Sequence, residues 1–414
     1  MVAKFSRRSA LGVLGAGAAA SAIFRSSVSY AQDDQVIRFG GTLGMSGRYA
    51  ETGLNILKGY ETAIKYLNEE KGGVEIAGKR YRFELGIVDD ASDPARATTL
   101  IQRQVDDGVD FFLGSYGSNV VLPCAGITEE AGKIIVQVGA SSDQIFTQGY
   151  HNIFGFFPRA SRAWNTSIEF FKSIEPKPKT VTVLATNDAF SKLNAKAAAA
   201  GCAEIGMEVL DVLELPEQVN DASSTLATIR SRTPDILITT TVDQNSLVIV
   251  RQMIATETNV PLLYQFLGPQ LPMYRESLGV KANGVVMQLP WDASLKFKDP
   301  IFGDTDSYIK YYNANNERPY SYHTVGASSC ITTYVEAMRT AGSLDPVVVR
   351  DALAATDITT VFGPVKFTKD GDGDPLLMGA KLGQVQDGEI KVVFPPKLKT
   401  GDLVYPTPAW NEKG

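Results

Sequence analysis

Hydroxyl-bearing residues follow two strand-like runs, and a helical pattern begins after each of them. The run "DFFLG" leads into "SYGSN", which contains Ser118, and the run "KIIVQV" leads into "GASSD", which contains Ser141 and Ser142. Because the carboxyl ends of parallel strands meet at one edge of a sheet, we expect both segments to face one crevice. Backbone N–H groups at a helix start can bind a carboxylate there. The alternative is plain helix capping, by Ser118 or Asn119 and by Ser141 or Ser142.

Two further strand ends bring acids and an amide to a similar position later in the chain. "ATNDAF" contains Asp188 and Phe190, and "TTTVDQN" contains Asp243 and Asn245. An acid at such a place could hold an ammonium or amide group of a ligand, while helix capping by either aspartate is the alternative. Aromatic side chains near these turns could stack on or cover an apolar ligand. They are Tyr49, Tyr116, Phe190 and Trp291, each of which could equally be a core or surface residue.

The glycine-rich segment "FGGTLGMSGRYAETG", residues 39–53, does not match a nucleotide-binding loop. A phosphate-binding loop requires G-x-x-x-x-G-K-[ST], whereas the chain reads "GRY" from Gly47. The dinucleotide pattern G-x-G-x-x-G fails because Gly41, Gly44 and Gly47 are spaced by three. The segment therefore predicts a strand, a turn that borders a ligand site of another kind, and a helix beginning near Glu51.

Metal and nucleophile chemistry have few residues available. The chain contains only two histidines, His151 and His323, and three cysteines. An odd and widely spaced set of cysteines does not predict a disulfide framework or a metal site. We expect them to be small core residues, with one disulfide as the alternative; they are Cys124, Cys202 and Cys330. We therefore expect no catalytic residue, no metal and no cofactor.

The motif "DGDGDP", residues 370–375, resembles the start of a calcium-binding loop. That loop needs glycine at its sixth position and glutamate at its twelfth, which here are Pro375 and Lys381. We expect a solvated hairpin turn instead.

The first residues have the pattern of an export signal. A basic start with Arg7 and Arg8 is followed by an apolar run over 11–24, too short for the about 20 residues of a membrane span. Cleavage is expected after Ala31. "SRR" resembles a twin-arginine signal, with an ordinary secretory signal as the alternative. Removing residues 1–31 takes away four basic residues and no acid, so the formal charge falls from −6 to −10. Such an acidic chain disfavours nucleic acid as a partner.

Strand and helix patterns alternate after the leader, which predicts parallel sheets covered on both faces. The length of the chain favours two lobes rather than one core. The expected strands are 36–43, 82–88, 110–114, 134–138, 181–185, 208–214, 236–240, 262–266 and 285–288. The expected helices are 51–69, 94–107, 160–174, 189–205, 222–232, 244–256, 271–278 and 322–341. The tail reads as short β-hairpins.

Residues 41–97, "GTLGMSGRYAETGLNILKGYETAIKYLNEEKGGVEIAGKRYRFELGIVDDASDPARA", resemble the opening of the branched-chain-amino-acid-type periplasmic binding proteins of ABC importers. "FLGSYGSN", "VQVGASSD", "PDILITTTVDQNS" and "FLGPQ" follow in the order that this family shows. The resemblance implies an α/β, type I periplasmic-binding-protein fold of two doubly wound lobes joined by three crossovers, without catalysis. We assign lobe 1 to residues 33–157 and 269–358, and lobe 2 to residues 158–268 and 359–414.

The resemblance also implies a ligand site between the lobes. By position, the carboxylate seat is Ser118 with Ala140 and Ser142, helped by Ser141, near Tyr116. The opening turn supplies Glu51 or Thr52, and the far lobe supplies Phe190 and a residue of the turn from Asp243 to Asn245. It further implies a periplasmic location and delivery of the ligand to an inner-membrane permease. A monomer is the default for a protein that must open and close.

One departure from the family concerns the amino group of a ligand. Amino-acid binders commonly have a tyrosine-glycine pair after the aspartate of the fourth strand, whereas this chain reads Asp-Ala-Phe-Ser from Asp188. The carboxylate seat is retained better than the amino-group seat, which disfavours an α-amino acid and allows a carboxylate without the amine, including an aromatic acid. The expected ligand is therefore a small carboxylate, either an amino acid or an aromatic or other organic acid. Two rival functions are a sensory module for a separate receptor and an enzyme with Asp188 and Glu51 as its acids.

Overall fold

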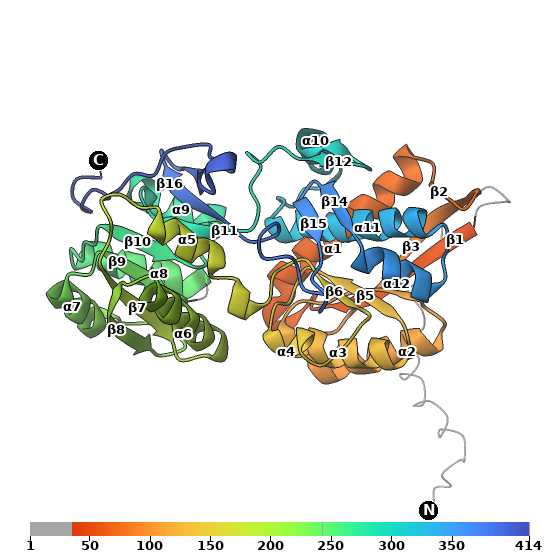
Figure 1. Ribbon diagram of the computed structural model, residues 1–414, viewed down its shortest axis with the longest axis horizontal. Helices are drawn as coiled ribbons and strands as arrows, with labels where there is room; N and C mark the ends of the chain where they lie inside the picture. The colour runs from red at the N-terminus through yellow and green to blue at the C-terminus, as the bar shows by residue number, and fades with distance from the viewer. Residues whose placement is uncertain (1–34, 242, 414) are drawn as a thin grey trace, which may run out of the picture. The chain divides into compact units, whose positions relative to one another are not determined.

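A computed structural model describes residues 35–241 and 243–413 of the chain. The expected export signal, residues 1–31, lies outside the described residues. From Gln35 onward, strands and helices alternate along the chain and build two sheets with helices packed on them (Figure 1).

Six strands form the first sheet, in the order β2-β3-β1-β4-β5-β6. They are β1 (Gln35–Leu43), β2 (Val74–Ile76), β3 (Lys79–Asp89), β4 (Phe111–Leu113), β5 (Ile134–Gln137) and β6 (Ile153–Gly155). Every neighbouring pair is parallel except β2 with β3. The segments that follow β1, β4 and β5 therefore lie at one edge of this sheet, as predicted.

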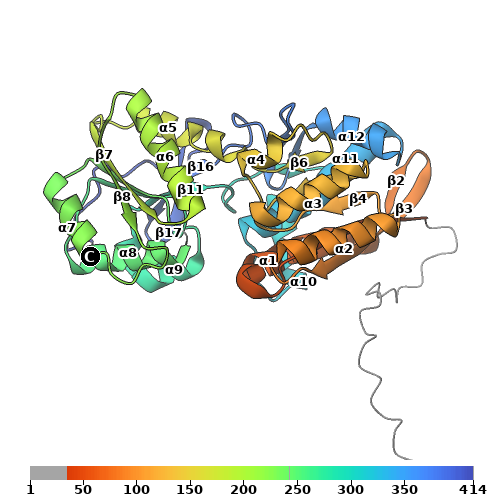
Figure 2. The ribbon, with the colours of Figure 1, turned by 90° about the horizontal axis from the view of Figure 1, so that it is seen from below.

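Helices cover both faces of the first sheet, because side chains alternate between the two faces along each strand. Phe112 and Ile135 face α2 (Pro94–Asp106) and α3 (Ser118–Glu130), which lie side by side in Figure 2. Leu113 and Val136 face α1 (Ala50–Lys65) and α11 (Tyr322–Ala341). The smaller helices of this lobe are α4 (Asp143–Phe146), α10 (Thr305–Asn315) and α12 (Pro346–Ala354).

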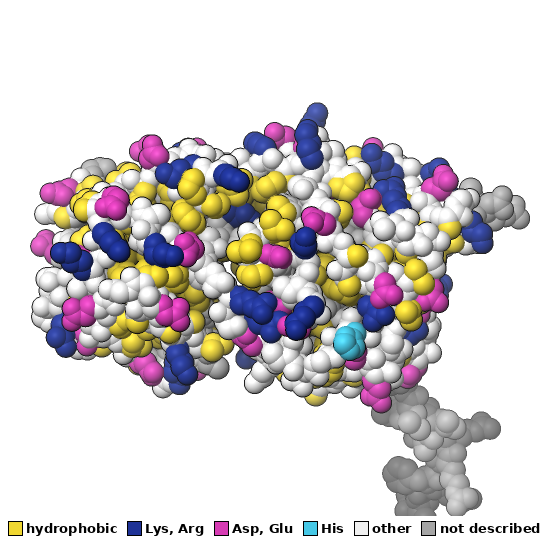
Figure 3. Space-filling model, in the orientation of Figure 1, with side chains coloured by type: hydrophobic (Ala, Val, Ile, Leu, Met, Phe, Trp, Pro, Cys, Tyr) yellow, Lys and Arg dark blue, Asp and Glu magenta, His cyan; other side chains and the backbone are white. Residues whose placement is uncertain are grey.

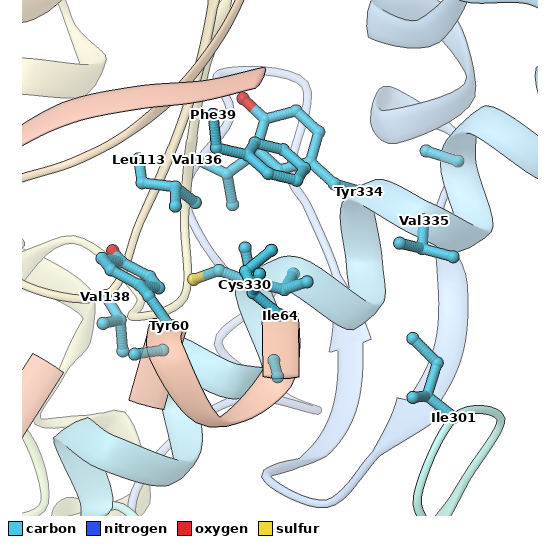
Figure 4. Packing of buried hydrophobic residues seen from close by; sticks show 14 of the residues in the cluster. Phe39, Tyr60, Ile64, Leu113, Val136, Val138, Ile301, Cys330, Tyr334 and Val335 are labelled. Carbon is cyan, nitrogen blue, oxygen red and sulfur yellow. The ribbon is translucent and has the colours of Figure 1, made fainter. Parts of the chain in front are cut away.

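Aromatic rings and aliphatic side chains together fill the core between the first sheet and α11 (Figure 4). The ring of Tyr334 lies 5.1 Å from that of Phe39, and its hydroxyl donates to the carbonyls of Phe112 at 2.9 Å and Ile134 at 3.1 Å. The Tyr60 hydroxyl donates to the carbonyl of Gly114 at 3.2 Å. Burying side chains of this size stabilises the fold by roughly 1.5–3 kcal/mol each, and the hydroxyls satisfy strand-end carbonyls.

Seven strands form the second sheet, in the order β17-β16-β11-β10-β9-β7-β8. They are β7 (Thr180–Thr186), β8 (Glu208–Leu215), β9 (Ile236–Thr239), β10 (Leu262–Gln265), β11 (Val286–Leu289), β16 (Lys381–Gln386) and β17 (Glu389–Phe394). The first five of these are parallel, β16 pairs with β11 antiparallel, and β17 pairs with β16 antiparallel. The last two strands are the hairpin that the tail sequence predicted.

Side chains also alternate between the two faces of the second sheet, and both faces are buried. Val183 and Ile238 face α5 (Asn165–Lys172) and α6 (Ala189–Glu204). Leu184 faces the other side, which is covered by α7 (Ser223–Arg232), α8 (Asp243–Ala255) and α9 (Pro272–Leu278). The two sheets with their helices correspond to the two expected doubly wound lobes.

The chain passes between the two sheets three times, after β6, after β11 and after β15 (Gly363–Lys366). The lobe boundaries differ from the expected ones at two places. Residues 269–289 were expected in lobe 1, but β11 pairs with β10 and β16 in the second sheet. Residues 359–366 were expected in lobe 2, but Val361 and Val365 are buried in the core of the first lobe. The hydrophobic pattern does not specify the lobe, because both cores bury the same residue types.

A buried ion-pair cluster joins the first and third of these connecting segments. The Arg159 guanidinium donates to Asp372 Oδ1 at 2.8 Å and to Asp370 Oδ2 at 2.6 Å. Asp372 is fully buried, and burial raises its pKa, but hydrogen bonds from Arg159 and Thr368 hold the pKa below its ordinary value. The expected hairpin turn at "DGDGDP" is confirmed, since an antiparallel bridge joins Phe367 and Gly373. Its expected solvation is wrong, because Asp372 is buried and pairs with Arg159, which is distant in sequence.

The three cysteines are buried and unpaired, as the core interpretation predicted. Among the described residues, no helix combines the length and the apolar character that crossing a membrane requires. Acidic and basic side chains are interspersed over the face seen in Figure 3.

Candidate ligand-binding site

Two strand-end loops of the first sheet lie against each other at the edge where their strands end. The loop after β4 leads into α3, and the loop after β5 leads into α4. The Gly117 N–H donates to the Gly139 carbonyl at 3.0 Å, and the Ser142 N–H donates to Ser118 Oγ at 3.2 Å. The structure thus brings together Ser118 and Ser142, two of the three serines named from the sequence, and Ala140 and Ser141 precede Ser142 in the same loop.

The start of α3 differs from the prediction of a serine or asparagine cap. The N-cap residue is Gly117, with a φ of 92°, and no side chain caps the helix. Ser118 is already the first helical residue, and Asn119 Oδ1 instead accepts a hydrogen bond from the Tyr49 hydroxyl at 2.9 Å. Among the described residues, the N–H groups of Ser118, Asn119 and Ser141 find no acceptor. Unpaired N–H groups at a helix start favour a bound anion.

Both serine hydroxyls retain a hydrogen to donate. Ser118 Oγ accepts from the Ser142 N–H, and Ser142 Oγ accepts from the Gln144 N–H at 3.3 Å, which is the expected cap of α4. A hydroxyl that accepts from a backbone N–H still has its own O–H, which can donate to another acceptor. Both residues are half-buried. The pair can therefore present two O–H donors to one carboxylate.

Gln137, the last residue of β5, shapes the loop that follows it. Its fully buried side chain accepts from the N–H of Gly139 at 2.8 Å and of Ala140 at 2.7 Å, and donates to the Ala140 carbonyl at 2.8 Å. Both backbone groups of Ala140 are thus satisfied, so Ala140 contributes shape to the seat rather than a donor. Sequence reasoning missed Gln137; the only signal was a polar residue within an apolar strand.

The turn after β1 lies against the same loops. The Tyr49 ring packs edge-to-face on that of Tyr116, with centroids 5.3 Å apart. Asp89 accepts from the Met45 N–H at 2.9 Å and holds this turn. Glu51 is exposed and pairs with Arg318 at 2.7 Å, while Thr52 is half-buried in the first turns of α1. Glu51 is therefore engaged within the first lobe.

Three rings that were not named for the ligand site from the sequence lie near Tyr116. The ring of His323, in the first turn of α11, lies 5.3 Å from Tyr116, 6.3 Å from Phe157 and 4.0 Å from Tyr322. These four residues, here called the aromatic cluster, come from three distant segments of the chain. No local pattern could have joined them. Trp291, expected near the crevice, is buried instead, and its indole N–H donates to the Val361 carbonyl at 2.8 Å.

Most of the residues predicted for the ligand site in the second lobe form hydrogen bonds within that lobe. Asp188 caps α6 by accepting from the Ser191 N–H at 2.8 Å. Burial raises the pKa of Asp188, but the hydrogen bonds from Ser191 and Thr186 outweigh burial and lower it. Asn245 is buried, with its amide bonded to the backbone of Glu217 and Val219. The capping alternative thus describes Asp188.

Phe190 is the exception among these residues. It is 39% exposed, and its ring contacts that of Phe266 edge-to-face at 5.8 Å. Asp243 begins α8, and its side chain lies outside the described part of the structure. The carboxyl edge of the second sheet thus has an aromatic surface at Phe190, and Asp188 beside it is already bonded as a helix cap.

A shallow polar hollow lies elsewhere on the second lobe, at the ends of β17 and α9. Arg275, Asp292 and Lys391 line it, and Lys391 pairs with Glu389 at 2.6 Å. None of the residues predicted for the ligand site borders this hollow. Because its charges neutralise one another, we place no site there.

Residues 36–389 match the family model of the periplasmic binding proteins. The chain belongs to this family of binding proteins. The resemblance stated from the sequence, to the branched-chain-amino-acid-type members, is confirmed by similar proteins. The leucine-specific-binding protein of Salmonella typhimurium is 24% identical over 348 residues, which cover 83% of this chain and 88% of that protein.

Solved structures show the same fold. A putative branched-chain amino acid ABC transporter protein from Silicibacter pomeroyi superposes with a TM-score of 0.78 at 21% identity, covering 91% of this binding protein and 100% of that chain. A solute binding protein from R. palustris, solved in complex with benzoate, gives a TM-score of 0.66 at 19% identity, covering 86% and 95% of the two chains.

Residues 35–241 and 243–413 contain no group of three or more histidine, cysteine or acidic side chains that could hold a metal ion. The first lobe of the binding protein has hydroxyls, backbone N–H groups and aromatic rings near the ends of β4 and β5. Such groups can bind and orient a small anion with an apolar body.

Proposed function

We propose that this protein is the substrate-binding component of an ABC importer, and that it captures a small carboxylate between its two lobes. The observation that carries the proposal is the pairing of Ser118 with Ser142, which leaves two O–H donors beside the unpaired N–H groups of Asn119 and Ser141. A carboxylate is the acceptor that such a donor set favours, because charge-assisted hydrogen bonds are the stronger ones.

The second lobe supplies the other side of the proposed site. Phe190 offers an exposed ring, whereas Asp188 is used as a helix cap. An acid already bonded to its own helix is a poor partner for a ligand ammonium group. We therefore favour an organic acid without an α-amino group, and an aromatic acid in particular, over an amino acid. The benzoate complex of the R. palustris protein is consistent with such a ligand in this fold.

The location, the oligomeric state and the delivery of the solute are proposed from the transport role. The protein acts in the periplasm after cleavage near Ala31, as a monomer that releases its solute unchanged to an inner-membrane permease. The ligand binds first to the lobe that carries Ser118 and is enclosed when lobe 2 closes, since contacts with both lobes favour the closed state. No cofactor takes part.

A thermal-shift screen tests this function. The mature protein, residues 32–414, is denatured and refolded to remove copurified solute. The panel contains branched-chain and aromatic amino acids, aromatic carboxylates, small dicarboxylates and amides. A ligand at a hundred times its dissociation constant stabilises the folded state by about 2.7 kcal/mol. We expect carboxylates without an amine to raise the Tm. If only amino acids raise the Tm, the proposed ligand class is contradicted. If no compound with a carboxylate raises it, amino acids included, the proposed function is contradicted.

A further inference from the structure

His323 lies at the margin of the proposed carboxylate seat. It is the second residue of α11, which begins with a capping box between Ser321 and Thr324. Gly326, one turn later, approaches Val138 so closely that a Cβ on the glycine would lie 2.4 Å from the valine side chain. Val138 stands two residues before Ala140. The first turn of α11 is thereby held beside the loop that follows β5.

The imidazole is enclosed by rings that are themselves partly accessible. Tyr116 and Phe157 meet it nearly perpendicularly, at interplanar angles of 88° and 89°, and Tyr322 lies over it at 32°. His323 is 8% exposed, whereas the three neighbouring rings are half-buried. Tyr116 is two residues from Ser118 in the same loop. A planar aromatic body attached to a carboxylate at Ser118 would meet these rings.

The imidazole nitrogens lack partners within the protein. The hydrogen bonds of the described residues include none to a ring nitrogen of His323, and neither nitrogen is among the polar atoms that are fully shut off from solvent without a partner. Burial lowers its pKa to about 3, so the ring is neutral in the periplasm and has one N–H donor and one nitrogen acceptor. Both nitrogens are therefore available to a ligand.

We infer that the site selects an aromatic carboxylate that bears a ring hydroxyl, and that His323 is the residue that recognises this hydroxyl. The inference rests on the proposed function, because the carboxylate must first be held at Ser118 and Ser142. A hydroxyl both donates and accepts, so it pairs with either nitrogen of the neutral imidazole. The surrounding rings of Tyr116, Phe157 and Tyr322 suit the planar body of the ligand.

Calorimetry with benzoate and with 2-, 3- and 4-hydroxybenzoate tests the inference on the mature protein. We expect one hydroxybenzoate to bind about tenfold more tightly than benzoate, as one neutral hydrogen bond in a buried site allows. His323→Phe keeps a planar ring and removes both nitrogens, so it should bind the two ligands equally. His323→Gln keeps a polar group and should retain part of the preference, and it provides a second test if the phenylalanine variant does not fold.

The matched control is His151→Phe, which changes the other, exposed histidine and should leave the preference unchanged. The inference is overturned if the wild-type protein shows no preference for a hydroxyl, or if the preference survives in both His323 variants. It is also overturned if carboxylates bind but aromatic ones do not, an outcome that leaves the proposed function intact. If no carboxylate binds at all, the proposed function and the inference fall together.

Discussion

The side chains of Ser118 and Ser142 each have two roles at the residue scale. Their oxygens accept from backbone N–H groups and fix the loops, and their hydrogens are proposed to donate to the ligand. The sequence could indicate both serines, because each stands between a strand and a helix. For Gln137 the sequence showed only a polar residue within an apolar strand, because the bonds of its buried amide to the Gly139–Ala140 backbone depend on the conformation of the loop.

We expect the double variant Ser118→Ala, Ser142→Ala to weaken carboxylate binding at least a hundredfold. Each lost charge-assisted hydrogen bond is worth about 1.5–3 kcal/mol. Calorimetry with the best ligand of the thermal-shift panel measures the change. Ser224→Ala, at an exposed position of α7, is the control and should bind as the wild type does. Unchanged affinity of a folded double variant would remove the carboxylate seat.

His323 leads to a prediction about acid stability. Its pKa is lowered by burial from 6.5 to about 3, so the unfolded chain takes up a proton between these values and the folded chain does not. Its contribution to the free energy of unfolding is therefore fully present above pH 6.5 and is lost as the pH falls toward 3. Denaturant unfolding at pH 7.5 and pH 5 should show a smaller loss in His323→Phe than in the wild type. An equal loss in both proteins would show that the imidazole is protonated in the folded state.

At the scale of elements, the alternation of strands and helices was predictable because each strand is a short apolar run and each helix an amphipathic one. The start of α11 after its N-cap Ser321 and the burial of β4 and β5 on both faces follow from such local patterns. The lobe of each later element was not predictable. The assignment of β11 depends on its partners β10 and β16, and no local signal specifies these.

The ion pair between two segments that connect the lobes leads to a prediction about stability. Arg159 and Asp372 form a buried pair, so removing one partner leaves an uncompensated charge. We expect Arg159→Met to lower the free energy of unfolding by about 3–5 kcal/mol. Lys298→Met breaks an exposed pair with Asp304 and should change stability far less. Urea unfolding compares the two variants, and equal effects would mean that the Arg159 cluster does not stabilise the connection.

At the scale of the whole molecule, membership in the periplasmic binding protein family accounts for the two sheets and the three passages between them. The sequence motifs were sufficient for this assignment because they extend over most of the chain. The ligand was not predictable, since its contacts come from turns that are distant in sequence. The aromatic cluster around His323 is an example, with members from three segments.

The most direct test of the central claim compares a carboxylate with its own amide. The tightest-binding carboxylate of the panel and the corresponding primary amide have the same body and differ in charge. Calorimetric titration of the refolded mature protein should give an amide affinity at least about tenfold weaker, because the donors around Ser118 and Ser142 lose a charged acceptor. Equal affinity for the two compounds would contradict a carboxylate seat at the first lobe.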